Sequence, residues 1–183
     1  MTTRDTPAAY GAVSRLNHWI GALFVILLLG IGLYFSDLPR GLEKTYWRSL
    51  HIAIGTIAIP FLLFRVFWRV RATSPLPPPQ APALQRLSNI VHALLLAGIV
   101  TMVVTGPLIQ WFGGRAFGIF DVVQFASPLA KSELWHKRME DIHGFVAWAI
   151  IWLLGLHLLG VIKHQFIDRD RLLARMTGRG LRG

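Results

Sequence analysis

The chain has 183 residues, of which 54% are hydrophobic and only 15% are charged. Soluble domains carry about 25% charged residues, so this composition excludes an ordinary soluble domain and indicates one small integral membrane domain. Cysteine is absent, which excludes disulfides, thiolate-bound metals, iron–sulfur clusters and covalently attached c-type haem. The formal net charge of +10 does not indicate nucleic-acid binding, because the basic residues flank apolar runs and are not gathered into one domain.

Four apolar runs follow one another along the chain, each long enough to cross a bilayer. They predict transmembrane helices at about 16–35, 50–68, 87–112 and 142–162, followed by a polar tail at 163–183. We expect residues 1–183 to form a single transmembrane domain. The first run is too long for the core of a signal peptide and no small-residue cleavage site follows it, so we expect it to be retained. The proline-rich segment 72–83 predicts a stiff, extended linker.

The distribution of basic residues predicts the orientation. Twelve lysine and arginine residues lie in the N-terminal segment, the second loop and the tail, against seven in the first and third loops. The positive-inside rule therefore places both termini in the cytoplasm. Because most of the connections are short, we expect an all-α, up-down-up-down four-helix bundle.

Histidines mark both ends of the fourth apolar run. His143 and His157 are fourteen residues apart, which places both imidazoles on one helix face and ~21 Å apart along the axis. In the predicted topology His18, His92 and His157 lie toward the cytoplasmic side, as an inner layer. His51 and His143 lie toward the other side, as an outer layer. Ionisable residues inside spans are costly and usually functional. The alternative, that these side chains only hydrogen-bond across helices, is less favoured for five histidines in two matched layers.

Two layers of imidazoles favour haem over other metal groups. A zinc site is disfavoured without cysteine, and no aspartate or glutamate lies within the predicted spans. Bis-imidazole ligation takes one histidine from each of two helices that meet across the bundle. His51 and His143 form the natural outer pair, whereas His157 has two possible partners, His18 and His92, between which depth does not choose. We therefore expect two non-covalent b-type haems, with space for them left by Gly21, Ala22, Gly55, Ala147 and Gly160.

The order and spacing of these motifs resemble the bacterial di-haem cytochrome b-561 family. The motifs are Arg-Leu-Asn-His18-Trp, Leu-His51-Ile-Ala-Ile-Gly and the His143–His157 spacing, and the resemblance runs from about residue 10 to 175. It implies a four-helix, multi-pass protein of the bacterial inner membrane with one haem between helices two and four and the other between helices one and four. The resemblance thus favours His18 over His92 as the partner of His157.

Steric room on the helix surface agrees with that choice. His18 is followed by Gly21 and Ala22 at the positions one turn on, whereas His92 is followed there by two leucines. Leucines on that face would crowd a porphyrin ring. We expect His18 to bind the inner haem iron and His92 to pack or bond near the inner haem or near the quinone that the resemblance implies as electron acceptor.

The resemblance also implies a function. The best-studied branch of the family is a superoxide oxidase, which passes electrons from superoxide outside the membrane to ubiquinone. We therefore expect an oxidoreductase with a small periplasmic donor, superoxide, and ubiquinone as acceptor. That branch has a Trp-His pair at its first helix-four ligand, whereas Trp135-His136 lies one heptad before His143 here. The alternative is a haem b anchor or electron-carrier subunit that serves a separate dehydrogenase or hydrogenase-like protein, because the same ligands serve both and a protein partner is not excluded.

Three further residues are candidates for the binding sites. His164 lies seven residues after His157, on the same face and near the membrane surface, at a family position linked to the quinone site. It can donate a hydrogen bond or a proton to a quinone; the alternative is an exposed interfacial histidine. Arg65 and Arg69 can pair with haem propionates, or they only contribute to the positive-inside signal. Besides membrane lipid, we expect as partners quinone and the small donor, and no nucleic acid.

Overall fold

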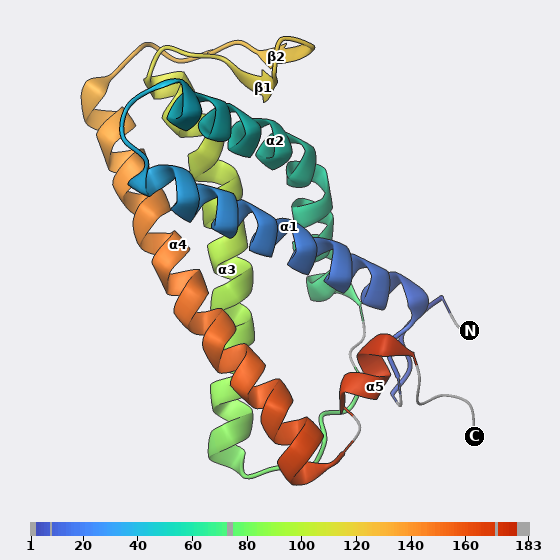
Figure 1. Cartoon of the computed structure of the whole chain (residues 1–183). Coiled ribbons are helices and arrows are strands. Elements are labelled where there is room, and N and C mark those ends of the chain that lie inside the picture. Colours follow the sequence, from blue (N-terminus) through green and yellow to red (C-terminus); the bar gives the residue numbers. More distant parts are fainter. Residues whose placement is uncertain (1–2, 8, 73–74, 171, 179–183) are drawn as a thin grey trace.

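The computed structural model describes residues 3–7, 9–72, 75–170 and 172–178. Four long helices make up most of it, and each is long and apolar enough to cross a membrane. Figure 1 shows their arrangement. Their bounds are α1 (Ala12–Asp37), α2 (Leu42–Arg71), α3 (Pro82–Phe112) and α4 (Glu133–Ile162).

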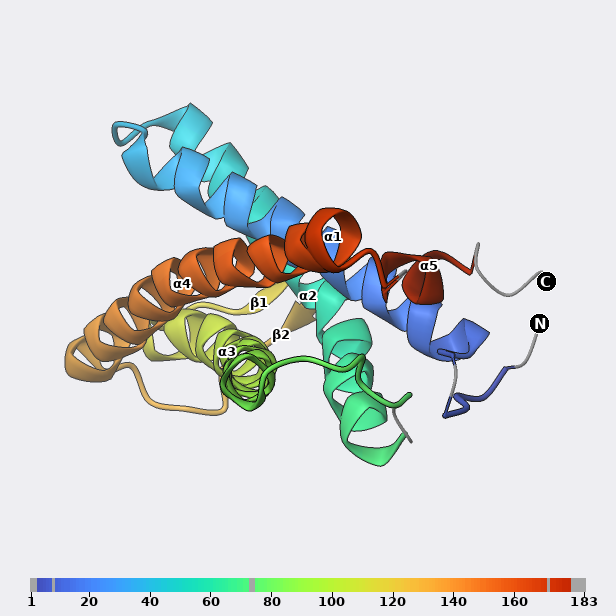
Figure 2. The same ribbon diagram turned by 90° about the horizontal axis from the view of Figure 1, so that it is seen from below.

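Consecutive helices run in opposite directions. Helix α1 packs along α2, α3 packs along α4, and α2 joins the two pairs through its contact with α3. The N- and C-terminal segments therefore lie at the same end of the molecule (Figure 1). The view from below shows α1 and α2 crossing the direction of α3 obliquely (Figure 2). The prediction of a four-helix membrane bundle is confirmed.

The helices extend beyond the apolar runs that predicted them. Helix α2 begins at Leu42 and α4 begins at Glu133, eight or nine residues before the corresponding runs. Hydropathy misses these turns because they are polar. Ser132 caps α4, since its hydroxyl accepts a hydrogen bond from the backbone N–H of Trp135 at 3.4 Å.

The C-terminal segment, predicted only as a polar tail, also contains helix. Helix α4 continues into a π-helical segment, η1 (Lys163–Asp168), and a short helix, α5 (Leu172–Thr177), follows. The indole of Trp19 donates to the carbonyl of Met176 at 3.1 Å, which holds α5 against the first turns of α1. Arg171, Arg179 and Arg182 of the predicted tail lie outside the described residues.

The proline-rich linker is held at one point. Positions 73–74 lie outside the described residues. Within the described part, the N–H of Leu76 donates to Pro7 and its carbonyl accepts from Arg175, both at 2.9 Å. Helix α3 then begins at Pro82, a favoured first position because proline lacks the N–H that this position leaves unbonded.

A small β-hairpin lies in the third loop, at the end of the bundle opposite the termini (Figure 1). Strands β1 (Phe117–Ile119) and β2 (Val123–Phe125) are antiparallel, with Phe117 opposite Phe125. The hydroxyl of Thr56 lies 3.2 Å from the carbonyl of Gly118 and joins the hairpin to α2. The apolar runs predicted only a loop here.

Half-way along the helices lies a compact apolar core. It consists of the buried Ala58, Leu62 and Ile99 with partly buried neighbours from α1, α2 and α3. Many other large apolar side chains are exposed, among them Trp152 at 73% and Leu23 at 64%. Such exposure is expected for helices whose outer surfaces face lipid tails.

Candidate functional site

The outer layer of the site consists of His51 on α2 and His143 on α4. Their ring centres are 6.4 Å apart, and the two ring planes make an angle of 77°. Both rings line a cavity of about 460 Å³ with mostly apolar walls. The structure therefore brings together the two histidines that the sequence predicted as the outer pair.

Glycines on the neighbouring helices keep space open beside both rings. A Cβ on Gly32 of α1 would lie 3.3 Å from Cε1 of His51, and one on Gly106 of α3 would lie 3.8 Å from Cε1 of His143. Both glycines line the cavity. Their role was not predicted, because the small residues expected to leave space follow each histidine on its own helix, whereas these two glycines lie on neighbouring helices.

Thr105 fixes the ring of His143. Its hydroxyl oxygen lies 2.7 Å from Nδ1 of His143 and 2.7 Å from the carbonyl oxygen of Thr101. A hydroxyl has one hydrogen, so it donates to the carbonyl and accepts from Nδ1–H. This tautomer leaves the Nε2 lone pair of His143 free for a metal. Thr105 is 4% exposed, so water does not compete for this hydrogen bond.

The ring of His51 has a different environment. Its Nδ1 is buried, and no hydrogen-bond partner of good geometry lies in the described part of the chain. Phe35 packs edge-on against the ring, with centres 5.5 Å apart. A buried imidazole that faces a second imidazole across an apolar cavity is costly unless it binds a ligand there.

Three histidines converge in the inner layer. The ring centre of His157 on α4 lies 6.4 Å from that of His18 on α1, at an interplanar angle of 49°. It lies only 5.2 Å from that of His92 on α3, at 74°. His92 is exposed, whereas His18 and His157 are partly buried.

The ring distances can be compared with the geometry of metal binding. Two imidazoles on opposite sides of one metal ion have ring centres roughly 6.3 Å apart, given a metal–nitrogen bond of about 2.0 Å. The His51–His143 and His18–His157 pairs fit this distance, whereas the His92–His157 pair is too close. The donor set fits as well, because paired imidazoles with no competing thiolate are ligands of b-type haem.

Arg65 lies directly beside the inner pair. One of its terminal guanidinium nitrogens is 2.9 Å from Nδ1 of His18. Its side chain also fills the space next to Gly21, where a Cβ would collide with Cδ of Arg65. Gly21 was expected to give room to a porphyrin; here it gives room to Arg65. Arg69 is exposed, one turn further along α2.

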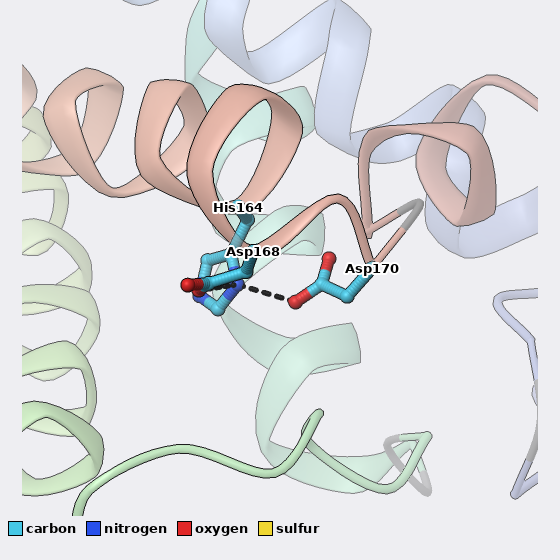
Figure 3. Close-up of side chains that lie close together, drawn as sticks. All are labelled: His164, Asp168 and Asp170. Atoms are coloured by element: carbon cyan, nitrogen blue, oxygen red, sulfur yellow. Dashed lines mark hydrogen bonds and ion pairs between the residues drawn. The ribbon is translucent and has the colours of Figure 1, made fainter.

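His164 lies in η1, in a well-defined environment. It is 8% exposed, so it is not an exposed interfacial histidine. Its Nδ1 lies 2.6 Å from Oδ2 of Asp170 and 3.2 Å from Oδ2 of Asp168 (Figure 3). His164 lines a second cavity, of about 260 Å³, together with His92 and His157. The two aspartates were missed, although carboxylates four and six residues after a histidine at a helix end are a usable signal.

His136 does not belong to either layer. Its Nδ1 donates to the carbonyl of Ile109 at 2.9 Å, and its Nε2 lies 3.4 Å from a carboxylate oxygen of Glu140. Both ring nitrogens are therefore engaged at the start of α4. The histidine of the Trp135-His136 pair thus links α4 to α3.

Four membrane-crossing helices that place facing imidazoles in two layers define a membrane-bound b-type cytochrome, a carrier of electrons. The model of the prokaryotic cytochrome b561 family matches residues 9–179. The chain therefore belongs to this family, which implies b-type haem and a redox role. Four spanning helices in a prokaryotic chain of this family indicate a multi-pass protein of the inner membrane.

Individual relatives match along nearly the whole chain. Cytochrome b561 homolog 2 of Escherichia coli K12 is 29% identical over 98% of this chain and 96% of its own length. Cytochrome b561 homolog 1 of the same organism is 24% identical, over 88% and 93%. A protein of Yersinia pestis named probable superoxide oxidase CybB is 21% identical, over 87% and 90%.

Proposed function

We propose that this chain, as one transmembrane domain, binds two b-type haems and carries electrons across the membrane to ubiquinone. In this proposal His51 and His143 bind the outer haem iron, and His18 and His157 bind the inner one. The observation that carries the proposal is the ring-centre distance of 6.4 Å in both layers. Each haem, when bound, supplies a one-electron redox centre.

The protein contributes ligation and insulation. Each iron would be held by two imidazoles, so the donor and the acceptor would exchange electrons with the haem without binding to the iron. The core of Ala58, Leu62 and Ile99 lies between the layers and excludes water from the path. Thr105 holds His143 in the orientation that ligation requires.

Arg65 is proposed to change partner when haem binds. In the structure it donates to Nδ1 of His18, whereas an imidazole that binds iron through Nε2 carries its proton on Nδ1 and cannot accept this hydrogen bond. We therefore expect Arg65 to leave His18 and to pair with a haem propionate. Arg69, one turn away, is the second candidate for such a contact.

The inner cavity is the proposed quinone site. Most of its wall area is apolar, and His164, His92 and Lys163 are among its polar groups, which suits an apolar molecule with two carbonyl oxygens. Reduction of one quinone to quinol takes up two electrons and two protons. His164 can supply a proton, because imidazole takes up and releases protons near neutral pH. The excess of basic residues near both termini supports a cytoplasmic position for this end.

Superoxide is the proposed donor, supported by the similarity to the probable superoxide oxidase and by the resemblance of the motifs. Two superoxide ions each give up one electron to the outer site and leave as oxygen. The test supplies the purified chain with an enzymatic source of superoxide and a short-chain ubiquinone, and measures quinol. We expect quinol formation that needs the chain, is suppressed by superoxide dismutase and is lost in the His51→Ala variant.

The alternative function predicts a different outcome of the same experiment. A haem b anchor or carrier subunit for a separate dehydrogenase would show haem reduction only when that protein is present. Quinol formation at the rate of the protein-free control, by a chain that contains haem, would therefore contradict the superoxide proposal and favour this alternative.

A further inference from the structure

A carboxylate fixes the histidine of the proposed quinone cavity. Oδ2 of Asp170 lies 2.6 Å from Nδ1 of His164, and Oδ1 of the same carboxylate accepts a hydrogen bond from the backbone N–H of Leu172 at 3.0 Å. Figure 3 shows the Asp170 side chain turned back toward the ring of His164. Both oxygens of Asp170 are therefore engaged, one on each side of the turn.

The local backbone creates this arrangement. Helix α4 widens into the π-helical η1, and Arg169 then adopts a left-handed conformation with φ of 53°. The N–H of Asp170 approaches the carbonyl of His164 at 3.3 Å. The chain thus reverses just where a carboxylate can reach the ring, and π-helical turns of this kind are frequent at functional sites.

The hydrogen bond sets the chemistry of the other ring nitrogen. Because the carboxylate accepts from Nδ1–H, neutral His164 has its lone pair on Nε2, and protonated His164 has a second N–H there. Nε2 is thus the ring nitrogen left to exchange protons with a molecule in the inner cavity, which His164 lines.

We propose that Asp170 is a positioning residue for proton delivery to the quinone, acting through His164. The inference rests on the proposed reduction of quinone at the inner cavity. In the step, the quinone receives its electrons from the inner redox site, and the N–H bond at Nε2 of His164 breaks as an O–H bond forms on a quinone oxygen. His164 is left neutral with its proton on Nδ1, and it regains a proton at Nε2 from cytoplasmic water. The second proton of the quinol comes from the same aqueous side.

Other charged and titratable groups surround His164, and one of them provides a control for Asp170. From its own segment these are Lys163 and Asp168, which form an ion pair with each other. Helix α4 contributes His157 and helix α3 contributes His92, both on the same cavity. Asp168 offers a matched control, because its carboxylate lies farther from Nδ1 than that of Asp170.

Asp170 also joins η1 to α5. The experiment therefore has to separate its support of this turn from its orientation of the His164 ring. Asp170→Asn keeps an oxygen that can accept from the N–H of Leu172, but it removes the charge. If its amide donates to Nδ1, Nε2 carries the proton of the neutral ring and cannot deliver a proton without forming an anionic imidazolate. The variant therefore retains the hydrogen bond to Leu172 that joins η1 to α5, and it disables the proton transfer from His164.

The experiment follows reoxidation of the dithionite-reduced chain by a short-chain ubiquinone in a stopped-flow spectrometer, between about pH 5.5 and 8.5. For Asp170→Asn we expect a rate loss of about 10-fold or more at neutral pH. We also expect the pH dependence of the reoxidation rate to differ from that of the wild type. Asp168→Asn should lose less than about two-fold, because its carboxylate is the more distant one.

The outcomes distinguish failure of the positioning role of Asp170 from failure of the proposed quinone reduction. A wild-type rate and pH profile in Asp170→Asn, or a loss that is equal at every pH, would overturn the positioning role. A reduced wild-type chain that ubiquinone does not reoxidise at any pH would instead remove the proposed function, and the inference with it. Unchanged haem spectra in both variants are expected, since neither aspartate contacts a proposed iron ligand.

Discussion

The hydroxyl of Thr105 on α3 lies 2.7 Å from Nδ1 of His143 on α4 and accepts a hydrogen bond from its N–H. This hydrogen bond joins α3 to α4, which also pack closely two turns away, where a Cβ on Gly98 would lie 3.0 Å from Cγ1 of Ile150. The orientation of a proposed haem ligand is therefore set by the packing of α3 against α4. A ligand fixed in this way does not have to be reoriented when the iron binds.

Thr105→Val tests this relationship. Valine keeps the shape of threonine but leaves Nδ1 of His143 without a partner, so we expect the outer haem to bind about 10- to 100-fold more weakly. Haem titration of the apoprotein, followed in the visible spectrum, measures the change. Thr105→Ser is the control and should bind haem like the wild type. Equal affinity in the valine and serine variants would show that the hydrogen bond does not support the ligand.

The two layers should behave as independent sites. His143 and His157 are ~21 Å apart along α4, and the apolar core lies between the layers. We expect His51→Ala or His143→Ala to remove the outer haem and to leave the inner low-spin spectrum largely intact. Haem content and reduced-minus-oxidised spectra measure this, and loss of both haems from a folded variant would argue against two separate pairs.

His18 and His92 provide a direct comparison in the inner layer. The His18 ring lies at the separation that one iron requires from His157, whereas the His92 ring lies closer, at 5.2 Å. We expect His18→Ala to abolish the inner bis-histidine haem and His92→Ala to keep two low-spin haems, with at most altered quinone reduction. Optical and electron paramagnetic resonance spectra of the two variants decide between them, and the reverse pattern would make α3 the partner of α4.

Sequence periodicity was sufficient to place the four spans and to put His143 and His157 on one helix face, but not to find the helix ends or the short helices of the C-terminal segment. Apolar runs predict spans because lipid excludes charge, and a fourteen-residue spacing predicts a shared face because helix geometry is regular. The spacing could not choose between His18 and His92, because that choice depends on how far apart neighbouring helices lie. The proposal that His18 is the partner of His157 rests instead on the ring distances.

Other features depended on contacts that no local pattern contains. Gly32 and Gly106 leave space beside histidines on different helices, so their role appears only once the helices are packed. The same holds for the hydrogen bond from Thr105. Asp170 reaches His164 only because η1 is π-helical and Arg169 is left-handed, and apolar periodicity does not predict such a turn.

The most direct test of the account is the number of haems per chain. Two bis-imidazole pairs without cysteine predict two non-covalent b-type haems. A pyridine haemochrome assay on the purified protein, combined with quantitative amino-acid analysis, should give a ratio near two, and acidified acetone should extract all of the haem. A ratio near one, with His18→Ala and His51→Ala both abolishing the same haem, would contradict the two-layer assignment on which the account depends.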